Sequence, residues 1–236
     1  LAIAGIAIGV VILPQLSKNV YLKNKKKISQ IQNKALELSM FLSLPASIAI
    51  FVGSEEIISA LFGYGSFDEE AVSNSAKALY FFSLGLPAFA LIKVFSTFFF
   101  ANRNTRIPFY ISLIAVILNI IISIYYFSEI GFIIVPIATS ISSWFNAILL
   151  FICLKNKNLF YFEKIFISKF LKILFSSVLM GISFNYIIMY FENQLTYSYN
   201  FKSLYLIFSV LLGLIFYLLI SFFIKAFNYK DLHLKY

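Results

Sequence analysis

Long apolar stretches, separated by short polar segments, constrain this chain more than any other feature. Of its 236 residues, 61% are hydrophobic and 12% are charged, against about 45–50% and about 25% in a typical soluble domain. A helix needs about 20 apolar residues to cross a bilayer, and it satisfies its backbone hydrogen bonds internally. We therefore predict an all-α integral membrane protein with about seven transmembrane helices, the first one partial, at residues 1–13, 35–52, 78–101, 108–127, 131–154, 170–191 and 203–224.

The charges of the connecting segments alternate along the chain. Acidic or nearly uncharged connections contain Glu55, Glu56, Asp68, Glu69, Glu70, Glu129 and Glu192, the last in a loop that also contains Lys202. Basic connections contain Lys18, Lys23, Lys25, Lys26, Lys27, Lys34, Arg103, Arg106, Lys155, Lys157, Lys164, Lys169, Lys172, Lys225, Lys230 and Lys235. Because Lys and Arg accumulate on the cytoplasmic side of a membrane, this pattern predicts a cytoplasmic C-terminus. The net charge of +9 fits this bias and attraction to anionic lipids rather than nucleic-acid binding.

Lys93 is an ionisable residue inside an apolar stretch. It lies about 12 Å from the cytoplasmic end of its predicted helix, at about 1.5 Å per residue. Ser96 and Thr97, three and four residues further on, share its helical face. An amine at this depth either faces a cavity or extends along the helix to the membrane surface. We expect the cavity, which makes this face a cationic, hydroxyl-lined stripe.

Polar residues also form rows on the two following predicted helices. Such rows either connect helices by hydrogen bonds or hold a small cation through oxygen ligands. We expect helix–helix contacts for Ser142 and Ser143, and both readings stay open for Asn119, Ser123 and Thr139. The rows comprise Ser112, Asn119 and Ser123, then Thr139, Ser142, Ser143 and Asn146. Closer to the cytoplasm, Lys34 and Glu37 are spaced for a local ion pair.

The chain can be divided by role into three parts. Residues 1–154 form a transmembrane bundle, residues 155–169 a cytoplasmic amphipathic connector, and residues 170–236 two further helices with a short cytoplasmic tail. The connector alternates lysines with aromatic residues such as Phe160 and Phe162. This composition fits either a segment whose rings lie at the acyl boundary or an ordinary aromatic belt. The single cysteine, Cys153, is expected to serve packing.

Six motifs occur in the order that is typical of one transporter family. They are LPxLSK at residues 13–18, a basic loop, LxLP at 42–45, LFGYGSFD at 61–68, LGLPAFALIKV at 84–94 and FFANRNTRIP at 99–108. Together they resemble the MurJ/MviN family, lipid II flippases of the bacterial inner membrane. The apolar segment 131–150 fits the same pattern.

The resemblance implies a fourteen-helix fold in which two six-helix lobes surround a cationic cavity and two more helices form a lipid groove. This chain would then hold the second lobe, from the end of helix 8 to helix 12, and the groove pair 170–191 and 203–224. We expect it to be a fragment whose first-lobe half is missing. The implied activity is flipping of lipid II by alternating access for peptidoglycan synthesis, with no enzymatic step.

The resemblance also assigns roles to particular residues. Lys93, with Ser96 and Thr97, would line the cavity and attract anionic groups of lipid II, a disaccharide peptide linked to undecaprenyl diphosphate. A short cytoplasmic turn, Arg103, Asn104, Thr105 and Arg106, would be structural. A sodium site of some members matches Asn119, Ser123, Val135 through its carbonyl, and Thr139, although Ser123 replaces an acidic residue. No cofactor is expected; a sodium ion or the membrane potential is the candidate driving force.

Three other functions are weighed against this one. An exporter of another polyprenyl-linked saccharide or of a drug would keep the fold. A membrane enzyme acting on polyprenyl phosphates would need carboxylates, histidines or a metal site at one membrane face, and the sequence offers no such constellation. A scaffold without transport would give no reason for Lys93.

Overall fold

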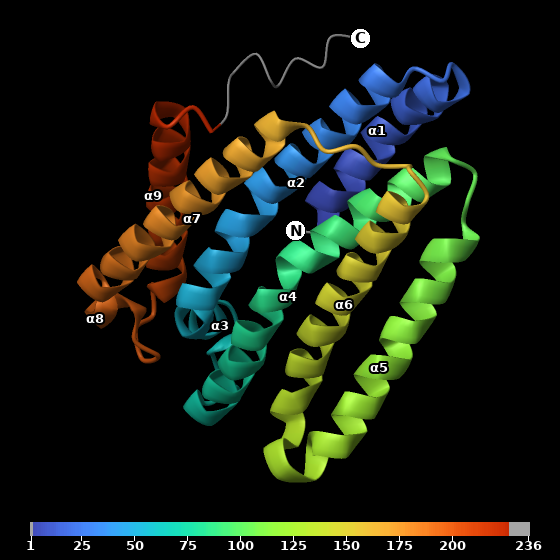
Figure 1. Ribbon diagram of the computed structural model, residues 1–236. Coiled ribbons are helices and arrows are strands. Elements are labelled where there is room, and N and C mark those ends of the chain that lie inside the picture. Colours follow the sequence, from blue (N-terminus) through green and yellow to red (C-terminus); the bar gives the residue numbers. More distant parts are fainter. Residues whose placement is uncertain (1, 227–236) are drawn as a thin grey trace. The chain divides into compact units, whose positions relative to one another are not determined.

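The computed structural model describes the backbone of residues 2–226, and the side chains of residues 8–163 and 165–226. Within that range the regular structure is entirely helical, as predicted. The order is α1 (Ala2–Tyr21), α2 (Lys25–Val52), α3 (Ser54–Phe62), α4 (Glu69–Ala101), α5 (Arg106–Ile130), a 3₁₀ turn (Gly131–Ile133), α6 (Ile134–Asn156), α7 (Lys164–Tyr190), α8 (Glu192–Leu195) and α9 (Lys202–Phe223) (Figure 1).

Five helical stretches among the described residues are long and apolar enough to cross a membrane. One of them, Arg106–Asn156, is 51 residues long and folds back at the 3₁₀ turn into the hairpin of α5 and α6 (Figure 1). It therefore accounts for two of the predicted crossings. α1 covers the predicted partial crossing 1–13 and continues through Pro14 to Tyr21, while Leu1 lies outside the described residues.

The chain divides into two compact units that interleave in sequence. Unit 1 comprises Leu1–Ser43 and Leu84–Ser168, and unit 2 comprises Leu44–Ser83 and Lys169–Tyr236. The long helices α2, α4 and α7 therefore contribute to both units. Pro45 and Pro87 lie close to the boundaries in α2 and α4, where their missing amide donors interrupt the backbone ladder.

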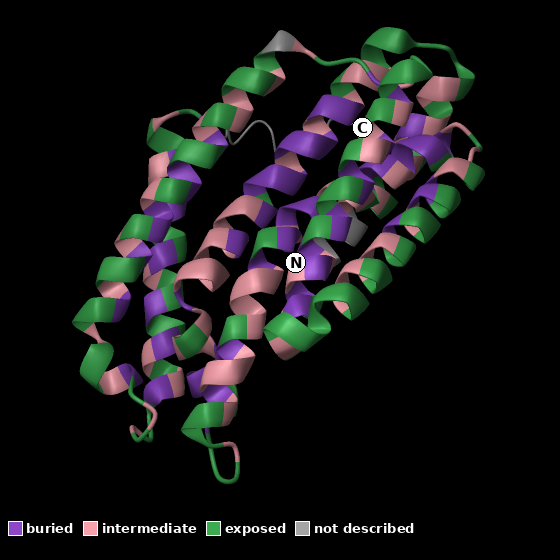
Figure 2. Ribbon diagram, turned by 60° about the horizontal axis from the view of Figure 1, so that its bottom comes forward, coloured by how far each residue is buried: buried purple, intermediate pink, exposed green. Residues whose placement is uncertain are grey.

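Unit 1 has an apolar core built from α1, α2, α4, α5 and α6. Fully buried Leu16, Phe98, Phe99, Leu150 and Leu154 lie at its centre, and Cys153 packs against it as expected. Much of α5 is exposed, including Phe109, Ile114 and Ile121 (Figure 2). An apolar helix surface of this length suits contact with lipid.

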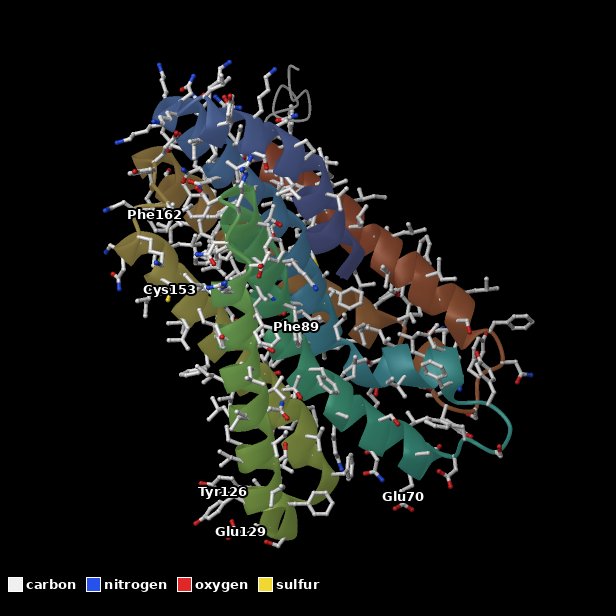
Figure 3. The ribbon with its side chains drawn as sticks, turned by 90° about the vertical axis from the view of Figure 1, so that its right-hand side faces the viewer. Glu70, Phe89, Tyr126, Glu129, Cys153 and Phe162 are labelled. Atoms are coloured by element: carbon white, nitrogen blue, oxygen red, sulfur yellow. The ribbon has the colours of Figure 1, made fainter. Side chains whose placement is uncertain are left out.

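The segment between α6 and α7 belongs to unit 1, and part of it packs into the core of that unit. Phe160 is buried at 6% exposure and stacks on Phe98, with ring centroids 5.9 Å apart. Side chains of α2 bind the backbone carbonyls on either side of Phe160. Gln32 Nε2 donates to Leu159 O at 2.7 Å, and Asn33 Nδ2 donates to Tyr161 O at 2.8 Å. The interfacial prediction is thus wrong for Phe160, since a ring in a core gains more contacts than a ring at a surface. Phe162 remains half exposed (Figure 3).

Unit 2 contains a short helix, α3, in a segment that the sequence analysis described only as an acidic connection. α3 follows Gly53, and α4 starts beside Asp68, whose Oδ1 accepts from Ala71 N at 2.8 Å. Glu55, Glu56, Glu69 and Glu70 lie in the first turns of these two helices, where the helix dipole favours negative charge. The predicted tail residues Lys230 and Lys235 lie outside the described residues.

Candidate functional site

A cavity of about 780 Å³ in unit 1 contains all three residues of the predicted cationic stripe. Lys93, Ser96 and Thr97 come from the C-terminal part of α4. The opposite walls come from α1, which provides Gly9, Val10 and Leu13, and from the start of α5. The stripe therefore faces a cavity within one compact unit.

The amine of Lys93 is exposed, and no carboxylate among the described residues lies within ion-pair distance of it. An ammonium inside an apolar helix loses hydration that lipid cannot replace, so it needs water or an anion nearby. The cavity supplies the space for either. The Lys93 side chain therefore does not need to extend along the helix to the membrane surface.

Thr97 is the buried residue of this stripe. It is buried at 8% exposure, and its Oγ1 donates to Lys93 O at 2.9 Å. A Cβ built on Gly9 would lie 2.9 Å from that oxygen. Because real Cβ atoms do not approach so closely, glycine is what allows α1 to pack on α4 at this point.

Arg106 joins the cavity, a role that the sequence interpretation did not give it. It was assigned to the cytoplasmic turn, yet Thr105 and Arg106 line the same cavity as Lys93. The turn spans only a few residues, so the start of α5 lies close to the end of α4 (Figure 1). This short connection was the signal that could have placed a second cation beside Lys93.

The rest of the turn is structural in the described geometry, consistent with its expected role. Arg103 adopts φ 57, and its N–H donates to Phe100 O at 2.9 Å. Asn104 Oδ1 accepts from Ile107 N at 3.3 Å at the start of α5. A non-glycine residue with positive φ is uncommon and is held here by the bonds on either side of it.

The polar rows on α5 and α6 face each other across the hairpin. Asn119 Nδ2 donates to Thr139 Oγ1 at 3.0 Å and to Ser142 Oγ at 3.3 Å. Asn146 Nδ2 donates to Ser112 Oγ at 3.4 Å. The expected helix–helix contact is present for Ser142, whereas Ser143 Oγ donates within its own helix to Thr139 O at 2.6 Å. The Lys34–Glu37 ion pair is present at 3.2 Å.

Three of the four predicted sodium ligands come together in the seam, the row of polar contacts between α5 and α6. Thr139 Oγ1 donates to Val135 O at 2.7 Å while accepting from Asn119. Ser123 Oγ is buried and has no hydrogen-bond partner among the described residues. All four offer neutral oxygens, which are hard ligands of the right kind, but the Asn119 amide presents its nitrogen to Thr139 and would have to turn over. The sodium site stays a prediction.

The loops of unit 2 contain a buried cation that sequence reasoning passed over. Lys202, at the start of α9, is fully buried, and its Nζ lies 4.5 Å from the ring centroids of both Tyr64 and Tyr197. It also donates to Gly63 O at 2.6 Å and Tyr197 O at 2.7 Å. Gly63 and Tyr64 belong to the motif LFGYGSFD, so Lys202 contacts two residues of that motif. The signal was a lysine opening an apolar helix on the side where basic residues are otherwise scarce.

Taken together, the apolar helices, the lipid-suited face of α5 and the membrane-depth lysine in a cavity define a multi-pass helical membrane protein. The sequence profile described as "Lipid II flippase MurJ" matches residues 1–208. The chain belongs to the MurJ family.

Individual relatives agree with this assignment. The chain is 33% identical over 181 residues to a probable lipid II flippase MurJ of Rhizobium tropici, covering 77% of this chain and 34% of that protein. A probable lipid II flippase MurJ of Thermotoga maritima is 33% identical over 183 residues, covering 77% and 36%. The chain thus spans about a third of the length of the curated relatives that it matches.

A solved structure shares the fold. "Lipid II flippase MurJ, inward closed conformation" superposes with a TM-score of 0.74 at 26% identity, covering 97% of this chain and 44% of that one. The resemblance seen in the motifs is confirmed, and the match is consistent with the predicted partial C-terminal lobe of a flippase.

Proposed function

We propose that this chain is part of a transporter that flips lipid II across the bacterial inner membrane, and that it performs no enzymatic step. Membership of the MurJ family supports the cargo. The observation that carries the proposal for this chain's own residues is the amine of Lys93 in the unit 1 cavity, which has no ion-pair partner among the described residues. The positions of its basic connections support a cytoplasmic C-terminus.

Lys93 and Arg106 would act by electrostatic attraction. A diphosphate is expensive to bring into hydrocarbon, and two cations in one cavity offset part of that cost. An arginine can bind phosphate oxygens through two parallel N–H groups, whereas a lysine acts as a point charge. Ser96 adds a hydroxyl on the same wall. The head group would thus be held by charge without any covalent chemistry.

The driving force is proposed separately. Sodium would be held by neutral oxygens of Asn119, Ser123, Val135 and Thr139. Hydrogen bonds join Asn119, Thr139 and Val135, and Ser123 Oγ is buried without a hydrogen-bond partner among the described residues. The membrane potential alone is the other candidate. Sodium-dependent rescue that disappears in Thr139→Val would favour the ion.

The test of the cargo is complementation of a flippase-depleted bacterium by the complete protein. We expect Lys93→Ala to abolish rescue and to lower lipid II at the outer face at least tenfold, since a hydrogen bond to a charged group is worth about 1.5–3 kcal/mol. Lys93→Arg should restore much of the activity. Lys77→Ala, at an exposed position of the same helix outside the cavity, is the matched control.

Two results would contradict the proposal. Full rescue by Lys93→Ala, with wild-type expression, would remove the role of the amine. Failure of the wild-type protein to rescue, combined with export of another saccharide-lipid, would assign a different cargo.

A further inference from the structure

A second cavity, of about 890 Å³, lies in unit 2 and is acidic. Five carboxylates line it: Glu55 and Glu56 from α3, Glu69 and Glu70 from α4, and Glu192 from α8. Glu70 lies in the first turn of α4, just beyond the loop that leads back to α3 (Figure 3). None of the five forms an ion pair with a described Lys or Arg.

The N-termini of α3 and α4 explain how several carboxylates can lie close together. They do not explain why these carboxylates line a cavity without a positive partner among the described residues. Acidic residues in the first turns of α3 and α4 gain from the partial positive charge of the helix ends. Burial raises the pKa of the Glu56 carboxyl, and repulsion from Glu55 adds to this effect. An added positive group would relieve both costs.

A separate observation points to a ligand. Ser59 lines the same cavity, is only 5% exposed, and its hydroxyl is buried with no hydrogen-bond partner among the described residues. A buried polar group without a partner costs about 1–3 kcal/mol. Lys202 does not neutralise the carboxylates of this cavity, since its ammonium donates to the carbonyls of Gly63 and Tyr197 and forms no ion pair among the described residues.

The spacing of the carboxylates selects the kind of cation. Among the described residues, no three Asp, Glu, His or Cys side chains come close enough together to hold one metal ion. Calcium needs six to eight oxygens around a single point, and magnesium needs an octahedron. An elongated organic cation can instead place separate ammonium groups near separate carboxylates, while Val72 and Ile188 contact its methylene groups.

We propose that the acidic cavity of unit 2 binds an organic amine that carries two or more primary ammonium groups. The carboxylates of Glu55, Glu56 and Glu192 accept from the ammonium groups, and the Ser59 hydroxyl accepts one further hydrogen bond. Such an amine is either a free polyamine or an amine-bearing peptide. The site is independent of the Lys93 cavity, which favours anions.

The experiment measures binding to the complete protein in an uncharged detergent at constant ionic strength, with spermidine as the first probe and a lysyl-lysine peptide as the second. We expect saturable binding of at least one probe. The double substitution Glu55→Gln with Glu192→Gln should weaken it at least tenfold, whereas Glu129→Gln, at the tip of the α5–α6 hairpin outside the cavity, should leave it unchanged. Tighter binding of spermidine identifies a free polyamine, and tighter binding of the peptide identifies a peptide amine.

A milder variant protects the test against misfolding. Ser59→Ala removes one oxygen and should weaken binding about threefold without loss of folding, as judged by an unchanged unfolding temperature without ligand. Three outcomes would overturn the proposal: no saturable binding of either probe, binding that Glu55→Gln with Glu192→Gln leaves unchanged, or equal competition by magnesium at matched charge. Lys93→Ala should not alter amine binding, so failure of this inference and failure of the proposed transport are separable.

Discussion

The ammonium of Lys202 lies 2.6 Å from the carbonyl oxygen of Gly63, 139 residues earlier in the chain. The same nitrogen donates to Tyr197 O at 2.7 Å and lies over the rings of Tyr64 and Tyr197. A Cβ on Gly63 would lie 2.6 Å from the backbone oxygen of Ser59 and 3.1 Å from that nitrogen, so the packing of this loop on α3 requires a glycine. One buried cation thus joins the loop after α3 to the loop before α9.

We expect Lys202→Met to destabilise unit 2 by about 2 kcal/mol, because Gly63 O and Tyr197 O lose a charged donor while buried. The measurement is thermal unfolding of the complete protein in detergent, with proteolysis of the 63–68 loop as a local readout. Lys77→Met, at an exposed position, is the matched control. Equal stability of Lys202→Met and the wild type would show that the two loops hold together without the amine.

The seam of the α5–α6 hairpin predicts a measurable coupling between Asn119 and Thr139. Asn119→Leu and Thr139→Val each remove the 3.0 Å bond, and the pair forms a double-mutant cycle. We expect a coupling of about 0.6 kcal/mol and no more than about 1.7 kcal/mol, the range found for such bonds between membrane helices. Additive effects would mean that the amide finds another partner.

The segment between α6 and α7 should loosen when its anchor on α2 is removed. Asn33 donates to Tyr161 O and accepts from Glu163 N at 3.2 Å, so Asn33→Leu breaks both connections. We expect tryptic cleavage at Lys157 to become several times faster, since local opening controls cleavage. Gln30→Leu, at an exposed position of the same helix, should cleave at the wild-type rate.

We expect the stability of the folded protein to depend on pH through Glu56. Burial raises the pKa of its carboxyl above the ordinary value of 4.5, so the protonated form is favoured in the folded protein. Its contribution to stability is therefore full below pH 4.5 and is lost as the pH rises through the folded-state pKa.

Glu56→Gln mimics the protonated form and should unfold at a higher temperature than the wild type at pH 8. The difference should shrink as the pH falls toward 4. Unfolding scans from pH 4 to pH 8 test this, with Glu129→Gln as the control. A gap that is constant with pH would assign the effect to packing rather than to protonation.

Much of the fold could be predicted because membrane spanning is a property of local composition. Among the described residues each predicted crossing coincides with a long helix apart from a few terminal residues, and the depth of Lys93 along its helix follows from the rise of α4 alone. The face shared by Lys93, Ser96 and Thr97 was also predictable, since residues three and four apart lie together on any helix. The same spacing placed the polar residues of α5 and of α6 in rows, but which residues of the two rows bond to each other was left open.

The misplaced residues are those whose partners lie far away in sequence. Phe160 resembled an interfacial ring until α2 and α4 buried it, and Arg106 resembled a turn residue until α5 folded back beside α4. The acidic residues near α3 resembled a solvated loop, although they line a cavity with Glu192. In each case the deciding contact comes from another element.

By itself, the amino-acid sequence determined the helices, the membrane class and the family, because hydrophobic length, helical periodicity and motif order are read along the chain. Only the tertiary structure decided that Lys93 and Arg106 share one cavity, that Lys202 is enclosed by two tyrosines, and that five carboxylates line another cavity. Burial and charge pairing depend on which segments meet, and that depends on packing across the chain.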